Sequence, residues 1–185
     1  MPASSQKVAS IDLEFMAQAI ALATQAEQIG EVPVGALVVC DGQIIGQGYN
    51  QTINLHDPCG HAEIIALRQA AQTLGNHRLS GCDLYVTLEP CTMCVGALIH
   101  ARIRRLVYAA SEPKAGAVVS QMQLLEQPYF NHSVQVISGL MADESGRMLS
   151  NFFKQRRKQH KANKADKADK ANSNSITDQS KDAVL

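Results

Sequence analysis

Residues 59–69 read CGHAEIIALRQ, and residues 90–98 read PCTMCVGAL. Each stretch begins with side chains that can bind a metal and continues as an apolar run with the spacing of a helix. The first follows a polar loop, and the second follows an apolar run, 82–88, that reads as a buried strand. The two stretches therefore predict two helices that carry chemically active residues in their first turns, as is typical of an α/β domain.

The elements around these two helices complete an α/β pattern. Helices are expected at 10–30 and 142–159, and strands at 33–40, 43–49, 104–110 and 134–140. Asp41 and Gly42 separate the first two strands and form a strong hairpin signal, because both turn positions tolerate positive φ. In the first helix the apolar stripe comprises Ile11, Phe15, Ala19, Leu22, Ala26 and Ile29. We expect one five-stranded mixed sheet with helices on both faces.

Length and composition favour a single domain with a basic appendage. The chain has 185 residues and no net charge, but residues 1–150 carry 8 Lys and Arg against 13 Asp and Glu, whereas residues 151–185 carry 9 against 4. We predict a folded domain over 1–160 and a disordered Lys/Asp/Asn/Ser-rich tail over 161–185. Such a tail either attracts a polyanion or only keeps the protein soluble.

The sequence favours a cytoplasmic protein. It has no apolar run long enough for a membrane span, and its first ten residues lack the basic and apolar segments of a signal peptide. Five cysteines in a reducing compartment favour metal binding or catalysis over disulfides. Cys40 and Cys82, next to strands, are expected to be small buried apolar residues.

Cys91 and Cys94 are three residues apart, so their sulfurs can converge from one helix turn. The helix N-terminus favours their thiolate forms, and His61 adds a nitrogen ligand from the neighbouring helix. Two sulfurs and one nitrogen suit zinc and leave its fourth position open to water. A structural zinc site, with Cys59 or Cys82 as fourth ligand, is the competing hypothesis for this set.

Glu63 lies two residues after His61, and in the first turn both side chains can reach a pocket beyond the helix end. A carboxylate beside metal-activated water can take its proton and deliver it elsewhere. The pattern therefore predicts a hydrolytic centre with His61, Cys91 and Cys94 as ligands and Glu63 as general acid and base. Of the other histidines, His56 and His132 are candidates for pocket neighbours.

The combination H-x-E and P-C-x-x-C, with Pro90 preceding Cys91, is the signature of zinc nucleobase deaminases. The chain resembles the cytidine deaminase-like superfamily and, within it, the bacterial tRNA-specific adenosine deaminases. The resemblance runs over nearly all of residues 10–160. Its quoted segments are EVPVGALVV, GYN, HDPCGHAEIIALR, DLYVTLEPCTMCVGALIHARIRRLVYAA, KAGA and FFKQRRK.

This resemblance implies a three-layer α/β/α fold and hydrolysis of adenosine to inosine at the wobble position of a tRNA anticodon. It also implies one zinc ion per subunit, a homodimer, and a final pair of parallel strands. Glu63 would move the proton of the attacking water to adenine N1 and then help ammonia leave. Asn50 and the backbone N–H of Ala62 would hold the flipped base.

The resemblance also implies a set of RNA contacts. The family's loop after the fourth strand reads D-x-K-x-G-A, and here Glu112 replaces the aspartate. We expect Glu112 to keep a contact with ribose, Lys114 to meet the RNA backbone, and Asn131 and Phe153 to contact loop nucleotides. Phe153 would pack on a base, and Cys59 is expected to be inert.

Two other functions remain open on the sequence alone. One is a salvage deaminase that acts on free guanine, cytosine or CMP, which the basic terminal helix and the absence of a nucleotide-phosphate cluster disfavour. The other is a catalytically silent RNA-binding relative, which the intact ligands and Glu63 disfavour.

Overall fold

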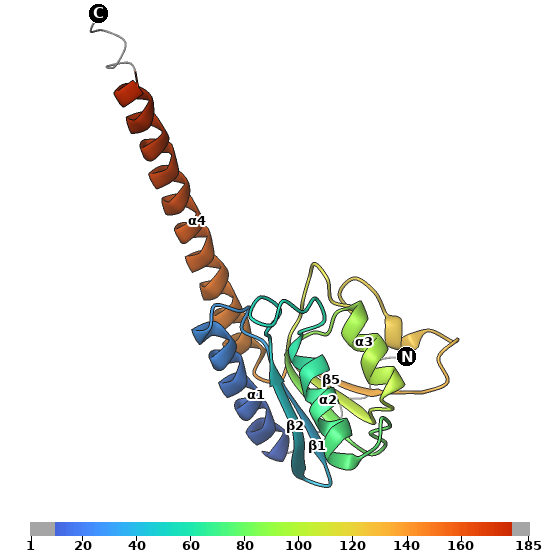
Figure 1. The fold of residues 1–185 in the computed structure, drawn as a ribbon. Helices are drawn as coiled ribbons and strands as arrows, with labels where there is room; N and C mark the ends of the chain where they lie inside the picture. Colours follow the sequence, from blue (N-terminus) through green and yellow to red (C-terminus); the bar gives the residue numbers. More distant parts are fainter. Residues whose placement is uncertain (1–9, 179–185) are drawn as a thin grey trace, which may run out of the picture. The chain divides into compact units, whose positions relative to one another are not determined.

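The computed structural model describes the backbone of residues 10–178 and the side chains of residues 10–164. Its centre is a five-stranded sheet in the order β2-β1-β3-β4-β5 (Figure 1). The strands are β1 (Gly35–Cys40), β2 (Gln43–Tyr49), β3 (Asp83–Leu88), β4 (Arg105–Ala110) and β5 (Gln135–Ser138). The helices are α1 (Ser10–Gln28), α2 (Ala62–Leu74), α3 (Thr92–His100), α4 (Ala142–Asp178) and the short 3-10 helix η1 (Leu124–Glu126).

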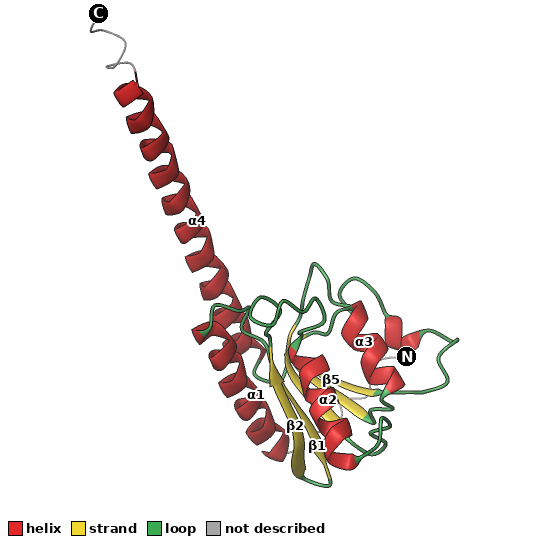
Figure 2. Ribbon diagram, viewed as in Figure 1, coloured by secondary structure: helices red, strands yellow, loops and turns green. Residues whose placement is uncertain are grey.

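The predicted three-layer α/β/α architecture is confirmed. Helix α1 packs on one face of the sheet, and α2 and α3 cover the other (Figure 2). Side chains alternate along each strand between the two resulting cores. In β3, for example, Leu84 and Val86 point into the α2/α3 core, whereas Tyr85 points into the α1 core.

The strand directions bring the ends of several elements to one edge of the sheet. β1 pairs antiparallel with β2 and β3, whereas β3, β4 and β5 are mutually parallel. Asp41 and Gly42 have φ values of 48° and 76°, which confirms the expected hairpin between β1 and β2. The end of β2, the start of β1 and the carboxyl ends of β3 and β4 therefore lie along the same edge.

Helix α2 lies unusually close to strand β2, because glycines occupy the contact. A Cβ on Gly48 would meet the Ala62 carbonyl oxygen at 2.5 Å and the Ala66 nitrogen at 2.8 Å, and one on Gly46 would collide with the Ala66 carbonyl. Only residues without a side chain permit this approach. The glycines of β2 thus set how deep the first turn of α2 lies in the domain.

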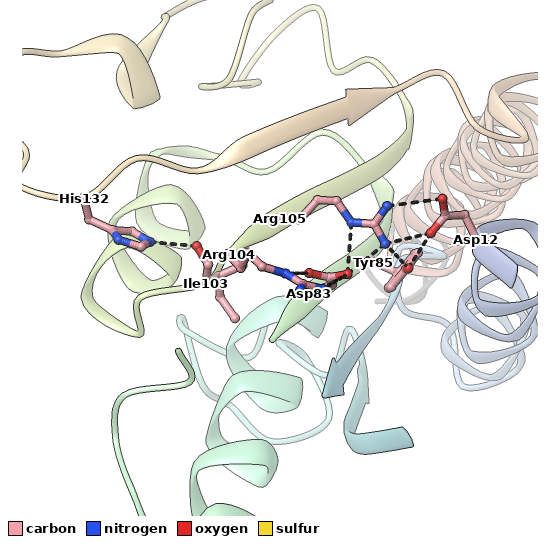
Figure 3. Close-up of polar contacts among 7 residues, drawn as sticks. All are labelled: Asp12, Asp83, Tyr85, Ile103, Arg104, Arg105 and His132. Atoms are coloured by element: carbon pink, nitrogen blue, oxygen red, sulfur yellow. Dashed lines mark hydrogen bonds and ion pairs between the residues drawn. The ribbon is translucent and has the colours of Figure 1, made fainter. Parts of the chain in front are cut away.

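A buried polar cluster links α1 to the opposite edge of the sheet, where β3 and β4 begin (Figure 3). Arg105 donates to Asp12 at 2.8 Å and to Asp83 at 2.9 Å, and Tyr85 donates its hydroxyl to Asp12 at 2.6 Å. Asp12 is fully buried, although the stripe predicted for this helix was purely apolar. Ile11 and Ile29, which were placed on that stripe, are instead 44% and 45% exposed.

The C-terminal helix extends beyond the predicted end. Helix α4 continues past residue 160 to Asp178, in a segment whose composition favours disorder. Charge and low complexity predict disorder there, but its alanines and lysines are good helix formers. Residues 179–185 lie outside the described part of the chain, and the predicted domain boundary at 160 stays a prediction. Within the described part of the chain, residues 10–149 and 150–178 belong to two separate compact units.

The helices of residues 10–178 include none that is both apolar enough and long enough to cross a membrane.

Candidate active site

The three predicted metal ligands converge at the starts of two helices. His61 is the N-cap of α2 and Cys91 the N-cap of α3, and Cys94 follows within the first turn of α3. The two sulfurs are 3.7 Å apart, and Nδ1 of His61 lies 3.7 Å from the Cys91 sulfur and 3.6 Å from the Cys94 sulfur. A tetrahedral zinc centre requires S–S separations of about 3.8 Å and S–N separations of about 3.5 Å. The donor set therefore fits zinc.

The electrostatics of the cluster favour a cation. The contact with Cys94 and the nearby His61 lower the pKa of the Cys91 thiol to about 3, against the effect of burial. The Cys91 contact and the charge of Glu63 raise the pKa of His61, although its own burial opposes this. The first shift favours the thiolate form of Cys91, and the second reflects the negative charges of Cys91 and Glu63 next to His61.

Glu63 lies in the first turn of α2 with its side chain turned inward, and the residue is only 4% exposed. Burial raises the pKa of its carboxyl group, and the neighbouring His61 partly offsets that rise. A carboxyl group whose pKa is raised toward neutrality can both accept and return a proton. Glu63 therefore has the surroundings of a general acid and base beside the ligand cluster.

A cavity of about 220 Å³ opens in front of these residues. It lies at the sheet edge where β2 ends and where β3 and β4 have their carboxyl ends. Its walls are formed by Val32, Val34, Asn50, Thr52, His61, Glu63, Leu88, Glu89, Cys91, Glu112 and Ala115. The cavity thus combines metal ligands, a proton-transfer group and polar side chains in one recess, as expected for a small-ligand site.

Asn50 and Ala62, which were expected to hold a base together, are bonded to each other. The backbone N–H of Ala62 donates to Oδ1 of Asn50 at 2.9 Å, and Ala62 is fully buried. Because Oδ1 of Asn50 accepts this hydrogen bond, the NH₂ group of Asn50 is left as the donor available to a ligand. Asn50 lines the cavity, so its side chain, oriented by Ala62, is the group that a ligand meets.

Two buried glutamates that no sequence motif indicated hold the cavity walls. Glu31 accepts backbone N–H bonds from Ile53 at 2.7 Å and Asn54 at 2.8 Å, and Glu89 accepts several from the loop after β4. Each glutamate stands next to apolar residues and a proline, in EVP and LEP. A charged residue within an apolar segment was the available signal.

Of the residues predicted to contact RNA, Glu112 lies at the cavity and the others do not. Glu112 lines the cavity, whereas Lys114 is exposed on the same loop. Asn131 and His132 line a second groove at the opposite ends of the strands, where His132 contacts the Ile103 carbonyl oxygen (Figure 3). His56 is exposed and does not line the cavity, so neither histidine is a pocket neighbour.

Phe153 belongs to the C-terminal unit, where it is 43% exposed and lies edge-on to Phe152. The three-ligand cluster includes no fourth cysteine or histidine among the described side chains. Cys82 is fully buried, as predicted, but Cys40 is only partly buried. The arrangement favours an open metal position over a closed structural site.

The chain is similar to known deaminases. The family model of the cytidine and deoxycytidylate deaminase zinc-binding region matches residues 9–110. The tRNA-specific adenosine deaminase of Haemophilus influenzae is 49% identical over 80% of this chain and 86% of that protein. The tRNA-specific adenosine deaminase of Agrobacterium fabrum is 48% identical over 77% of this chain and 94% of that protein.

Two solved structures are similar in fold. One, from a study of A-to-I editing by tRNA:A34 deaminases at the wobble position of transfer RNA, has 48% identity and a TM-score of 0.72. The alignment covers 74% of this chain and 99% of that one. A guanine deaminase from Nitrosomonas europaea has 25% identity and a TM-score of 0.66, over 81% of this chain and 88% of that one.

Proposed function

The chain belongs to the cytidine and deoxycytidylate deaminase family, in its branch of tRNA-specific adenosine deaminases, and on this premise we propose that it converts adenosine to inosine at the wobble position of a tRNA anticodon. The observation that carries the proposal is the buried Glu63 beside a three-ligand cluster with zinc spacing. The identity of 48–49% to relatives of that activity supports the choice of substrate.

His61, Cys91 and Cys94 hold the zinc ion. When bound, zinc lowers the pKa of a water molecule and so supplies a nucleophile at neutral pH. Glu63 accepts a proton from the attacking water and delivers it to N1 of adenine as oxygen adds to C6. Glu63 then helps the amino group leave as ammonia, so that adenosine and water give inosine and ammonia.

The cavity holds a single base that leaves the stack of the anticodon loop. The NH₂ group of Asn50 donates to the base, and Ala62 keeps Asn50 in that orientation through its backbone N–H. Val32, Val34 and Leu88 provide the apolar surface against which the ring packs. A direct bond between Ala62 and the base stays a prediction.

Four residues are proposed to contact the RNA outside the base. Glu112 meets a ribose hydroxyl at the cavity rim, and Lys114 meets the phosphate backbone. Asn131 and Phe153 contact further nucleotides of the loop, Phe153 by stacking. We further propose that the enzyme is a homodimer and works in the cytoplasm, where its tRNA substrate is found.

The test is a comparison of substrates with zinc-loaded protein. The protein is incubated with a transcribed tRNA that carries adenosine at the wobble position, and separately with guanine, cytosine and CMP. Nucleoside mass spectrometry should detect inosine at that position and no product from the free compounds. The same tRNA with guanosine at the wobble position is the control. Turnover of guanine without any inosine would instead identify a salvage deaminase.

A further inference from the structure

Glu89 is a buried carboxylate that the proposed chemistry does not use. It follows the last residue of β3, lies two residues before Cys91, and is 2% exposed. Its Oε1 accepts the backbone N–H groups of Val118 at 3.1 Å, Val119 at 2.8 Å and Ser120 at 2.9 Å. Its Oε2 accepts the N–H of Glu112 at 3.0 Å and the hydroxyl of Ser120. Every donor belongs to the loop after β4.

The loop lies so close to Glu89 that only glycine fits at its centre. A Cβ on Gly116 would overlap the carboxyl group of Glu89. Gly116 also forms an isolated bridge with Cys91, and the N–H of Ala117 donates to the Pro90 carbonyl at 2.9 Å. The segment that carries the metal ligands and the loop that forms one cavity wall are therefore joined around a single carboxylate.

Glu89 differs from Glu63 because both of its carboxylate oxygens are already saturated with hydrogen bonds. A carboxylate that already accepts five hydrogen bonds has little capacity left for a substrate proton. The same bonds fix both ends of the loop, at Glu112 and at Ser120. Glu112 itself lines the cavity, and its carboxylate accepts the N–H of Lys114 at 2.9 Å.

We propose that Glu89 is a positioning residue that holds the 112–120 loop as the ribose-side wall of the cavity and so determines how tightly the RNA substrate binds. This inference rests on the proposed function, because the loop's ligand is the ribose and phosphate next to the target adenosine. Glu89 acts through Glu112 and Lys114 and touches neither the base nor the reacting atoms.

Glu89→Gln tests this role with minimal change in shape. The amide oxygen can replace Oε1, but the NH₂ group then faces the N–H of Glu112, so two donors meet where one bond existed. Hydrogen–deuterium exchange of zinc-loaded, full-length protein should become about tenfold or more faster at Glu112 and its neighbours, as expected when a bond to a charged acceptor is lost. Zinc content should not change.

Kinetics with an anticodon stem-loop give the second readout. For Glu89→Gln we expect KM to rise about tenfold and kcat to change less than about threefold, because the ligands and Glu63 stay in place. If wild-type protein makes no inosine, the proposed function fails, and the exchange measurement still decides whether Glu89 anchors the loop.

The matched control is Glu31→Gln, which alters the buried carboxylate of the opposite wall. Its faster exchange should be confined to residues 52–54 and should leave 112–120 unchanged. If Glu89→Gln does not fold, Ser120→Ala removes only the hydroxyl contact and should accelerate exchange at the distal end of the loop about threefold or more. Unchanged exchange in 112–120, an unchanged KM in an active enzyme, or loss of zinc from Glu89→Gln would each overturn the proposal.

Discussion

Glu63 and Glu89 are buried carboxylates of the same cavity, yet their pKa values are shifted in opposite directions. Burial dominates at Glu63 and raises its pKa. At Glu89 burial also acts to raise the pKa, but the bonds from Ser120, Val119 and Glu112 outweigh it and lower the pKa. Two environments thus prepare one carboxyl group to exchange protons and the other to remain a fixed anion.

Replacing Glu63 by alanine should abolish deamination and leave zinc binding intact. The carboxylate is not one of the three clustered ligands, and loss of general acid-base catalysis typically costs about 10²–10⁴-fold in rate. Metal analysis and a timed inosine assay on the same preparation measure both quantities. Cys91→Ala is the comparison, and it should lose zinc as well as activity. Substantial turnover by Glu63→Ala would remove Glu63 from the mechanism.

Gly48→Ala should damage both stability and activity, because the added methyl group collides with the backbone at the start of α2. Overpacking of this kind typically costs about 1–3 kcal/mol and would displace His61 and Glu63. Gly96→Ala, within α3, is the control. A Cβ there meets nothing within 4 Å, so we expect a gain of about 0.5–1 kcal/mol from helix propensity.

Thermal unfolding and the inosine assay on both glycine variants provide the check. Equal stability of Gly48→Ala and Gly96→Ala would contradict the close helix–strand contact.

The adjacent Arg104 and Arg105 should differ sharply in their contribution to stability. Arg105→Met leaves the buried Asp12 and Asp83 without its guanidinium group, whereas Arg104, whose side chain is 59% exposed, contributes one largely solvated ion pair. We expect a loss of about 3–5 kcal/mol for Arg105→Met and about 1 kcal/mol or less for Arg104→Met. Urea unfolding of zinc-loaded protein measures both, and similar values would mean that burial does not matter here.

Glu112→Ala should reduce the preference of the enzyme for an RNA substrate over the same DNA substrate. A carboxylate at the cavity rim can accept a bond from a 2′-hydroxyl, and loss of such a bond reduces the discrimination by about one to two decades. The experiment compares kcat/KM on an anticodon stem-loop and on the same hairpin with deoxyribose around the target. Glu126→Ala, an exposed glutamate on η1, is the control. A ribose preference that survives Glu112→Ala would assign the selection to another residue.

Removal of residues after His160 should weaken tRNA binding only modestly. The removed segment has five lysines and four aspartates, so its net charge is small and the expected loss is about threefold at low salt. Binding measured at two salt concentrations with full-length and truncated protein tests this. A loss of tRNA affinity on truncation that is no smaller at the higher salt concentration would argue against an electrostatic role.

The sequence predicted the sheet and the metal cluster well, because both depend on local signals. The Asp41-Gly42 turn, the apolar strands and the C-x-x-C spacing each need only a few neighbouring residues. His61 could be added to Cys91 and Cys94 because all three stand at helix starts, which the strand directions then bring to one edge.

Contacts between segments far apart in the sequence could not be predicted from sequence patterns. The burial of Asp12 could not be predicted, because its partner Arg105 lies 93 positions away in the sequence. The role of Glu89 could not be predicted either, because its five donors come from a loop that lacks any periodic pattern. The bond between Ala62 and Asn50 depends on how α2 sits on β2, which no propensity encodes.

The convergence of His61 and Cys91 from two different helix starts has a thermodynamic consequence. The two residues are 30 positions apart, so an ion held between them acts as a removable cross-link across that segment. Closing such a loop restricts the unfolded chain by on the order of 3 kcal/mol in the chain-entropy description used for disulfides. Metal occupancy and folding are therefore coupled: a chelator should shift the unfolding midpoint, much as a reducing agent does in a secreted protein.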